Sequence, residues 1–366
     1  MDPVSGPDVD ETLSTDLQRT LSLSDPLTTP PPSPSPSLPS PLDDCLDVDS
    51  LQELAVRGSW RSILDKVSRA RKLSLLKTPH EHLVYLSFNV LSLLKLRRFS
   101  DAASDLSSLL SPSSPDADPF DDPRYRYETY PDVYPGRSGS MVPFALRWIH
   151  ALLPQHLGRR SETLDRLYLL LDLVRRKAWK RREVSVLSSI VANHFAHREF
   201  DVCLALIGDL LRLRSSDPVL LSRLGYVQTQ MGDLEGARDT FARVEALSAD
   251  VNLVSRNRAV IRVVEKEFTE AVREYEVCVE RDPSDVVAIN NKALCLMYSR
   301  DLSGAIKVLE GALERVPTEA LNETVVVNLC SMYELAHVNH SDIKKSLGNW
   351  IAKVAPDDFD SSCTRL

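Results

Sequence analysis

Three segments of the sequence repeat one helical pattern at a regular spacing. Segments 232–244, 266–278 and 300–312 each place an alanine at the same register and a bulky apolar residue four positions later. The alanines are Ala237, Ala271 and Ala305, and the bulky residues are Phe241, Tyr275 and Leu309. A small residue where two helices cross closely, with a large one a turn later, is typical of a helical hairpin that stacks on its own copies.

The helix that precedes each of these segments carries a small residue of its own. Gly225, Ala259 and Ala293 follow the same spacing, and Pro283 and Pro317 end two of the hairpins. A period of about 34 residues, as seen here, is that of the tetratricopeptide repeat. The clearest repeats are therefore 218–251, 252–285 and 286–319.

Weaker copies of the pattern lie on both sides of these repeats. Segments 198–211, 159–174 and 97–110 place Cys203, Thr163 and Ala102 where the alanine belongs, and the first helix is expected near Leu51. Segment 323–336 reads as another first helix, with a late partner at 344–355. We therefore expect an all-α chain whose residues 47–366 form a superhelical solenoid of αα-hairpins.

Residues 1–46 differ from the rest in composition. Residues 1–50 hold ten acidic side chains and one basic one, so their net charge is −9, whereas the whole chain carries −8. Ten of the 23 prolines lie in residues 1–41. Such a segment cannot bury enough apolar surface to offset its ordering entropy, which predicts a disordered acidic, Pro/Ser-rich tail. Its Ser/Thr-Pro steps are either kinase substrates or unmodified linker, at Thr29, Ser33, Ser35 and Ser40.

Composition argues against several classes of protein. Twelve glycines in 366 residues are too few to favour Rossmann or P-loop folds. No apolar run reaches the roughly 18 residues of a membrane span, and the first residues lack the apolar stretch of a secretory signal. The six cysteines show no paired spacing, which favours reduced thiols in a cytosolic protein, at positions 45, 203, 278, 295, 330 and 363.

No residue pattern predicts catalysis or a cofactor. The phosphate-loop, nucleophile-elbow and zinc-protease motifs are missing from the sequence. The pairs His194/His197 and His337/His340 lack a further ligand to complete a tetrahedral metal site, so we expect partly exposed helix residues there. The cysteines within the helical patterns are expected to act as small core residues.

A run of six cations surrounds Trp179 in residues 175–182. It fits either a contact with an acidic protein or a solvated helix end, where cations interact favourably with the helix dipole. Nucleic acid is not favoured, because interleaved aromatic residues and a positive net charge are lacking.

Residues 115–143 interrupt the repeats with a segment rich in tyrosine and proline. Tyr125, Tyr127, Tyr130 and Tyr134 lie within ten residues, close to Pro131 and Pro135. A long loop inside a compact array is usually functional or disordered, and four amphipathic rings favour an ordered segment that docks onto a surface.

Repeat arrays bind peptides or helices on the face lined by the first helix of each pair. Positions expected on that face include Tyr226, Arg256, Val260, Asn290 and Met297, and most of the face is apolar. Chaperone-binding repeats carry lysine and asparagine at two of these positions. Here Arg256 and Val260, or Asn290 and Leu294, stand in their place, which disfavours a co-chaperone.

The interrupting segment resembles a known family. YRYETYPDVYPGRSGSMVPFALRWIHALLPQHLG (125–158) and the helix at 161–167 are similar to the twelfth-subunit family of the TRAPP (transport protein particle) tethering complex, whose animal members have a longer N-terminal region. The resemblance covers roughly 47–366.

The resemblance implies a non-catalytic scaffold subunit of a TRAPP III-type complex, which activates a Rab GTPase in ER-to-Golgi traffic and autophagy. Expected partners are other subunits, the eighth and eleventh in particular, and the expected location is cytoplasmic, peripheral to Golgi and ER-Golgi membranes. Tyr125, Tyr127, Tyr130, Tyr134 and Arg137, with the inner-face residues above, would dock other subunits. The alternatives are a peptide-binding co-chaperone and an enzyme whose site is built from Arg, His and Tyr of the insertion.

Overall fold

The computed structural model describes residues 48–108 and 119–364, and within them every regular element is a helix. The prediction of an all-α chain of tetratricopeptide-type hairpins is confirmed. The predicted disordered tail, residues 1–46, lies outside the described residues. By their internal contacts the described residues divide into two compact units, one of 48–190 and 356–358 and the other of 191–355 and 359–364. The division falls within α8 (Lys180–Ala196).

The first unit contains the N-terminal hairpins and the tyrosine-rich insertion. Its helices are α2 (Val48–Val56), α3 (Trp60–Lys72), α4 (Pro79–Lys95), α5 (Phe99–Ser107), α6 (Phe144–His156) and α7 (Arg160–Arg176), and it includes the start of α8. Three single-turn 3-10 helices lie between α5 and α6, namely η1 (Pro119–Asp121), η2 (Pro123–Tyr125) and η3 (Tyr127–Thr129). Helix α6 is buried along nearly its whole length, so it forms the centre of this unit.

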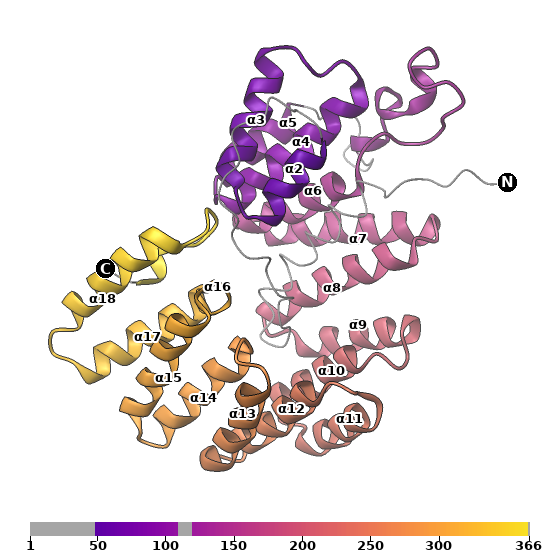
Figure 1. The fold of residues 1–366 in the computed structure, drawn as a ribbon. Coiled ribbons are helices and arrows are strands. Elements are labelled where there is room, and N and C mark those ends of the chain that lie inside the picture. Colours follow the sequence, from indigo (N-terminus) through magenta and orange to yellow (C-terminus); the bar gives the residue numbers. More distant parts are fainter. Residues whose placement is uncertain (1–47, 109–118, 365–366) are drawn as a thin grey trace. The chain divides into compact units, whose positions relative to one another are not determined.

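The second unit contains the repeats that are clearest in sequence. Its helices are α9 (Phe200–Leu213), α10 (Pro218–Met231), α11 (Leu234–Leu247), α12 (Val251–Val264), α13 (Phe268–Arg281), α14 (Val286–Tyr298), α15 (Leu302–Arg315), α16 (Pro317–Ala320), α17 (Glu323–Ala336) and α18 (His340–Val354), followed by η4 (Ser361–Thr364). From α9 to α15 each helix packs against the next in order (Figure 1).

The small residues of the repeat pattern lie where helices cross. Ala237, Ala271 and Ala305 are completely buried, as are Ala102, Thr163 and Cys203 at the equivalent places of the weaker copies. A Cβ atom added to Gly225 would lie 2.4 Å from a ring carbon of Phe241, so α10 and α11 approach too closely for any side chain there. The predicted register is confirmed.

Aspartates begin many of the helices of the second unit. Asp233 accepts a hydrogen bond from Gly236 N, and Asp301 accepts one from Gly304 N, which satisfies backbone donors of the first turn. The other aspartate caps in this unit are Asp217, Asp250 and Asp285. Local sequence therefore fixes where these helices start.

The tight connections use a residue in the left-handed backbone region. Within the second unit these residues are Arg198, Gly232, Lys266 and Arg300, with φ between 58° and 86°. Only glycine adopts this conformation without steric cost, and other L-residues incur about 1 kcal/mol or more. At three of these four turns packing of the flanking helices therefore overrides local preference.

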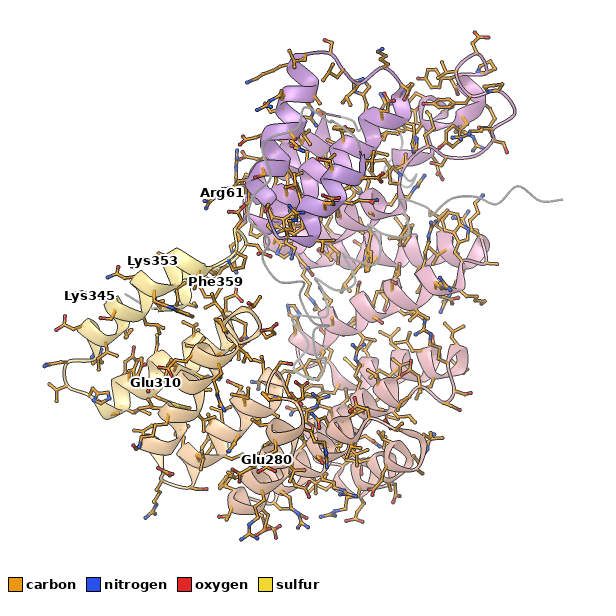
Figure 2. All side chains as sticks on the ribbon, in the orientation of Figure 1. Arg61, Glu280, Glu310, Lys345, Lys353 and Phe359 are labelled. Carbon is orange, nitrogen blue, oxygen red and sulfur yellow. The ribbon has the colours of Figure 1, made fainter. Side chains whose placement is uncertain are left out.

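Charged side chains project outward from the helices of the second unit. Glu280 on α13 and Lys345 and Lys353 on α18 are exposed, as Figure 2 shows. Glu310 on α15 instead accepts a hydrogen bond of 2.7 Å from the hydroxyl of the buried Tyr333 on α17.

Candidate protein-interaction site

The tyrosine-rich insertion is held closed by backbone bonds between its two ends. Arg126 and Ser140 form an isolated antiparallel β-bridge. The backbone N–H of Tyr127 donates to the carbonyl of Gly139 at 3.0 Å. The carboxylate of Glu128 accepts the N–H of Gly139 at 2.9 Å. Hydrogen bonds from its own backbone N–H and from that of Gly139 lower its pKa to about 2. Residues 126–140 therefore form an ordered loop.

A buried arginine of α6 fastens this loop to the first unit. Arg147, 6% exposed, donates through Nη2 to the carbonyl of Phe120, to Asp121 and to the hydroxyl of Ser140, at 3.0, 3.2 and 3.1 Å. Its guanidinium also lies 5.6 Å from the centre of the Phe120 ring. Sequence reasoning missed Arg147, although a lone arginine in the apolar stretch FALRWIHALL could have drawn attention to it.

Tyr125 belongs to the core and not to the surface. Its residue is 7% exposed, its ring centre lies 6.3 Å from that of Phe120, and the guanidinium of Arg124 lies 4.7 Å from its ring centre. Burial raises the pKa of its hydroxyl. Tyr125 is thus packed within the first unit, and its contact with another protein stays a prediction.

Tyr127 and Tyr134 fasten the loop to the start of α4. Their rings meet edge to face with centres 5.0 Å apart. The hydroxyl of Tyr134 accepts the backbone N–H of His80 at 3.1 Å, which satisfies one of the free donors of the first turn of α4. The ring centres of His80 and Tyr127 lie 5.9 Å apart. The guanidinium of Arg137 makes a cation–π contact with the Tyr127 ring, 5.8 Å from its centre. Both tyrosines therefore serve the attachment of the loop itself.

The remaining part of the loop faces solvent. We call residues 130–136, apart from the attached Tyr134, the exposed turn. Tyr130 in it is partly buried, Val133 is 48% exposed, and Pro131, Asp132, Pro135 and Gly136 are exposed. An apolar side chain and two prolines thus face solvent on a loop that is fixed at both ends and therefore preorganised.

The residues predicted on the inner face of the repeats are largely occupied by packing. Tyr226 is partly buried with its ring 5.7 Å from Phe195, Met297 packs against the core of α14–α17, and Val260 is partly buried. The amide oxygen of Asn290 accepts a hydrogen bond of 2.7 Å from Asn328. These side chains join neighbouring repeats.

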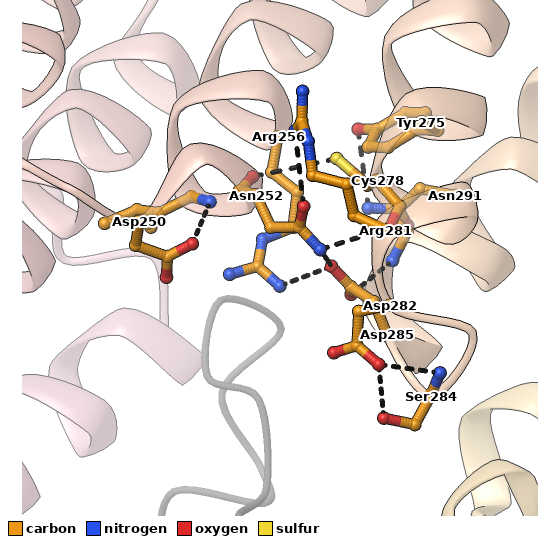
Figure 3. Close-up of polar contacts among 12 residues, drawn as sticks. Asp250, Asn252, Arg256, Tyr275, Cys278, Arg281, Asp282, Ser284, Asp285 and Asn291 are labelled. Atoms are coloured by element: carbon orange, nitrogen blue, oxygen red, sulfur yellow. Dashed lines mark hydrogen bonds and ion pairs between the residues drawn. The ribbon is translucent and has the colours of Figure 1, made fainter.

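Arg256 lies in a buried ion pair. The residue is 3% exposed, and its Nη1 donates to Oδ2 of Asp285, a completely buried residue, at 2.9 Å. Asn252 donates to the same oxygen at 3.2 Å (Figure 3). A cavity of about 330 Å³ opens beside this network, between the start of α12 and the end of α13. The charge of Arg256, predicted at an inward, protein-binding position, thus joins α12 to the start of α14 in this structure.

The cysteine thiols of the described residues are not activated. Burial raises the pKa of Cys203, Cys278 and Cys295 to about 11 and that of Cys363 to about 12, so these thiols stay protonated. Among the residues that the structure describes, no group of three His, Cys, Asp or Glu side chains could hold a metal ion. None of the described helices has the length and apolar character to span a membrane.

The sequence of the chain is similar to several curated proteins. It is 31% identical over 281 residues to trafficking protein particle complex subunit 12 of Mus musculus, a match that covers 68% of this chain and 35% of the mouse protein. The human subunit 12 is 29% identical over 362 residues, covering 86% of this chain and 48% of the human protein. The chain is a relative of subunit 12.

The resemblance inferred from the tyrosine and proline block is thereby confirmed. The chain spans less than half the length of the subunit 12 proteins that it matches. No family model matches it. Among solved structures, the apo form of the quorum sensor NprR from B. thuringiensis is 14% identical with a TM-score of 0.48, over 81% of this chain and 84% of that one, a likeness too weak to bear on function.

Proposed function

We propose that this chain is a non-catalytic scaffold subunit of a trafficking protein particle complex of the TRAPP III type. In this role it binds other subunits, the eighth and eleventh among them, and takes part in Rab activation, ER-to-Golgi traffic and autophagy only through that assembly. The observation that carries the proposal is the similarity to subunit 12 over 68–86% of the chain.

The described architecture is consistent with a binding role. Within the first unit, Arg147 of the buried helix α6 holds the insertion, which presents an ordered, partly apolar turn. Binding surfaces are commonly loops held by a rigid scaffold. We propose the exposed turn, 130–136, as the part of the insertion that contacts another subunit.

The decisive experiment is native affinity purification of the tagged full-length chain with mass spectrometry of the eluate. We expect near-stoichiometric recovery of the other subunits of the complex. Recovery of the chain alone would reject this function. Recovery of chaperones would also reject it and would favour the co-chaperone alternative.

The contact surface is tested with a Tyr130→Ala/Val133→Ser variant, which alters the exposed turn and leaves the attachment of the loop intact. Its matched control is Leu335→Ser, which changes an apolar residue that is 69% exposed on α17. We expect the first variant to lose at least one subunit and the control to retain all of them, with equal thermal midpoints. Full retention by both variants would remove the exposed turn from the contact. Substituting Tyr127 and Tyr134 would be less informative, because both hold the loop in place.

The proposed location is the cytoplasmic face of Golgi and ER-Golgi membranes, reached by association with the complex. Fractionation of cells that lack a partner subunit tests it. The tagged chain should shift from the membrane fraction to the soluble fraction, and unchanged membrane association would contradict the proposal.

A further inference from the structure

The connection between α7 and α8 concentrates positive charge on the first unit. We call residues 175–182 the basic turn. Six of its eight residues are cationic, namely Arg175, Arg176, Lys177, Lys180, Arg181 and Arg182. All but Arg182 are exposed. Neither the proposed scaffold role nor the packing of the repeats requires so many like charges together.

Two carboxylates of the same helices neutralise part of this charge. Glu183, 4% exposed, accepts from Arg175 Nε at 2.9 Å and from Lys180 Nζ at 3.3 Å. Burial opposes its ionisation, but these bonds outweigh burial, so its pKa lies below the usual range. Arg176 pairs with Asp172 at 2.9 Å. Six cations and two anions leave a net charge of +4 over residues 172–183.

The basic turn is also rigid and carries an aromatic face. The guanidinium of Arg182 contacts two rings, 4.3 Å from the centre of Trp179 and 4.9 Å from that of Phe144. The backbone N–H of Trp179 donates to the carbonyl of Val174 at 3.0 Å. Trp179 nevertheless remains 38% exposed. A fixed indole face bordered by cations therefore stands ready for an acidic segment with apolar or proline residues.

The composition of the chain's own N-terminal segment complements this surface. Residues 1–46 hold eight acidic side chains and one arginine, a net charge of −7, and TTPPPSPSPSLPSPL lies at 28–42. Prolines dock readily on aromatic side chains, and opposite charges attract across partly desolvated surfaces. Reach is not limiting, because 46 extended residues span up to about 150 Å. Covalent linkage raises the effective concentration to about the millimolar range.

We propose that the basic turn is the docking surface for the acidic N-terminal segment, residues 1–46, of the same chain. Carboxylates of the segment contact the cations of the turn, and its prolines pack against Trp179. Phosphorylation at Thr29, Ser33, Ser35 and Ser40 strengthens the contact, since each phosphate adds roughly −1.5 to −2 charges at neutral pH.

The test uses the full chain and zero-length carbodiimide cross-linking, which joins carboxylates to lysines in contact, followed by mass spectrometry. We expect links from residues 1–46 to Lys177 and Lys180. The Lys180–Glu183 link is an internal positive control for the folded turn. Lys345 and Lys353, exposed on α18, measure the background from random encounters (Figure 2).

Three changes probe the charge dependence of the links. Arg176→Glu should reduce them several-fold without removing a reactive lysine, whereas Arg273→Glu should not, although it alters an equally exposed ion pair on α13. Salt of about 0.5 M should reduce them as well, because it screens charges over a few ångströms. After phosphorylation by a proline-directed kinase, a higher salt concentration should be needed to reduce the links.

Several outcomes would overturn the proposal. Links spread evenly over Lys177, Lys180, Lys345 and Lys353 would mean random encounter. Links that join only isotopically light to heavy copies in a mixed sample would mean contact between molecules. Absence of links, together with binding of the basic turn to vesicles of phosphatidylserine and phosphatidylcholine, would assign it to a membrane surface.

Discussion

The buried ion pair between Arg256 and Asp285 offers the sharpest test of the structure. Asp285 accepts hydrogen bonds from Arg256, from Asn252 and, as the cap of α14, from the backbone N–H of Ala288 at 3.0 Å. Asp285→Asn retains the shape and an oxygen for the cap but removes the negative charge. Arg256, 3% exposed, would then carry an uncompensated charge inside the repeats.

The magnitude follows from this burial. Removing one partner of a buried ion pair costs about 3–5 kcal/mol, and loss of a helix cap costs roughly a further 1 kcal/mol. We therefore expect Asp285→Asn to lower the free energy of unfolding by about 3 kcal/mol or more, and Asp285→Ala to lower it further. In the double variant Arg256→Met/Asp285→Asn the buried charge is gone, so about 1–3 kcal/mol should be recovered.

The assay is urea-induced unfolding of the full chain followed by circular dichroism. Hydrogen exchange in α12 and α14 accompanies it, because a repeat array need not unfold as one unit. The matched control is Glu270→Ala, which removes an ion pair with Arg273 whose side chains are 49% and 69% exposed. Such an exposed pair contributes about 0.2–1 kcal/mol.

A clear result would refute the reasoning. If Asp285→Asn cost no more than Glu270→Ala, or if the double variant were less stable than Asp285→Asn alone, the pair would not be a buried link between α12 and α14. Arg256 would then be free for a ligand in the adjoining cavity.

Three further perturbations test other parts of the structure. Glu128 is held ionised by donors such as Gly139 N, so its contribution is fully present above its usual pKa of 4.5 and is lost as the pH falls toward about 2. Amide exchange in 126–140 should therefore be faster in Glu128→Gln than in the native chain at pH 6, and this difference should vanish at the lowest pH. Gly225→Ala should cost about 1–3 kcal/mol in thermal or urea unfolding, with partial recovery on Phe241→Leu, because the added Cβ meets that ring. In a Cys45→Ser chain, iodoacetamide at pH 8 should label the native thiols far more slowly than the unfolded ones, and fast labelling would contradict their burial at Cys203, Cys278, Cys295, Cys330 and Cys363.

The repeat register was accessible from sequence because it depends on spacing. Ala237, Ala271 and Ala305 recur at one fixed interval, and any helix pair with that pattern must bury them. Degenerate copies with Thr163 or Cys203 were recognisable for the same reason. The hairpin fold can thus be predicted from the repeat spacing alone, without knowledge of contacts between residues far apart in sequence.

Pairing between residues far apart in sequence was not accessible in this way. Arg256 was placed on the inner face by its helix position, and nothing in the sequence pattern pointed to its partner Asp285, 29 residues further along the chain. Likewise, the tyrosine content predicted docking of the insertion. It did not show that Tyr134 docks on the backbone of His80, 54 residues upstream. Which side chains pair in such contacts is decided only when the helices have packed together.

The left-handed turns also bear on the order in which the second unit folds. The α10–α11 connection combines glycine at the left-handed position, Gly232 with φ of 86°, with an aspartate cap, Asp233. The α12–α13 connection has Lys266 there and no side-chain cap, and the α14–α15 connection has Arg300 with a cap. The local sequence therefore favours the chain reversal most strongly between α10 and α11.

Folding of a repeat array can start at any hairpin and spread to its neighbours. The hairpin whose turn forms with the least strain has the lowest nucleation barrier, and each later hairpin can use the surface already formed as a template. We therefore expect the transition state of the second unit to contain α10 and α11 in native contact. The following helices, up to α14, would then add to this hairpin. The turn at Lys266 would form only once α13 has packed against α12.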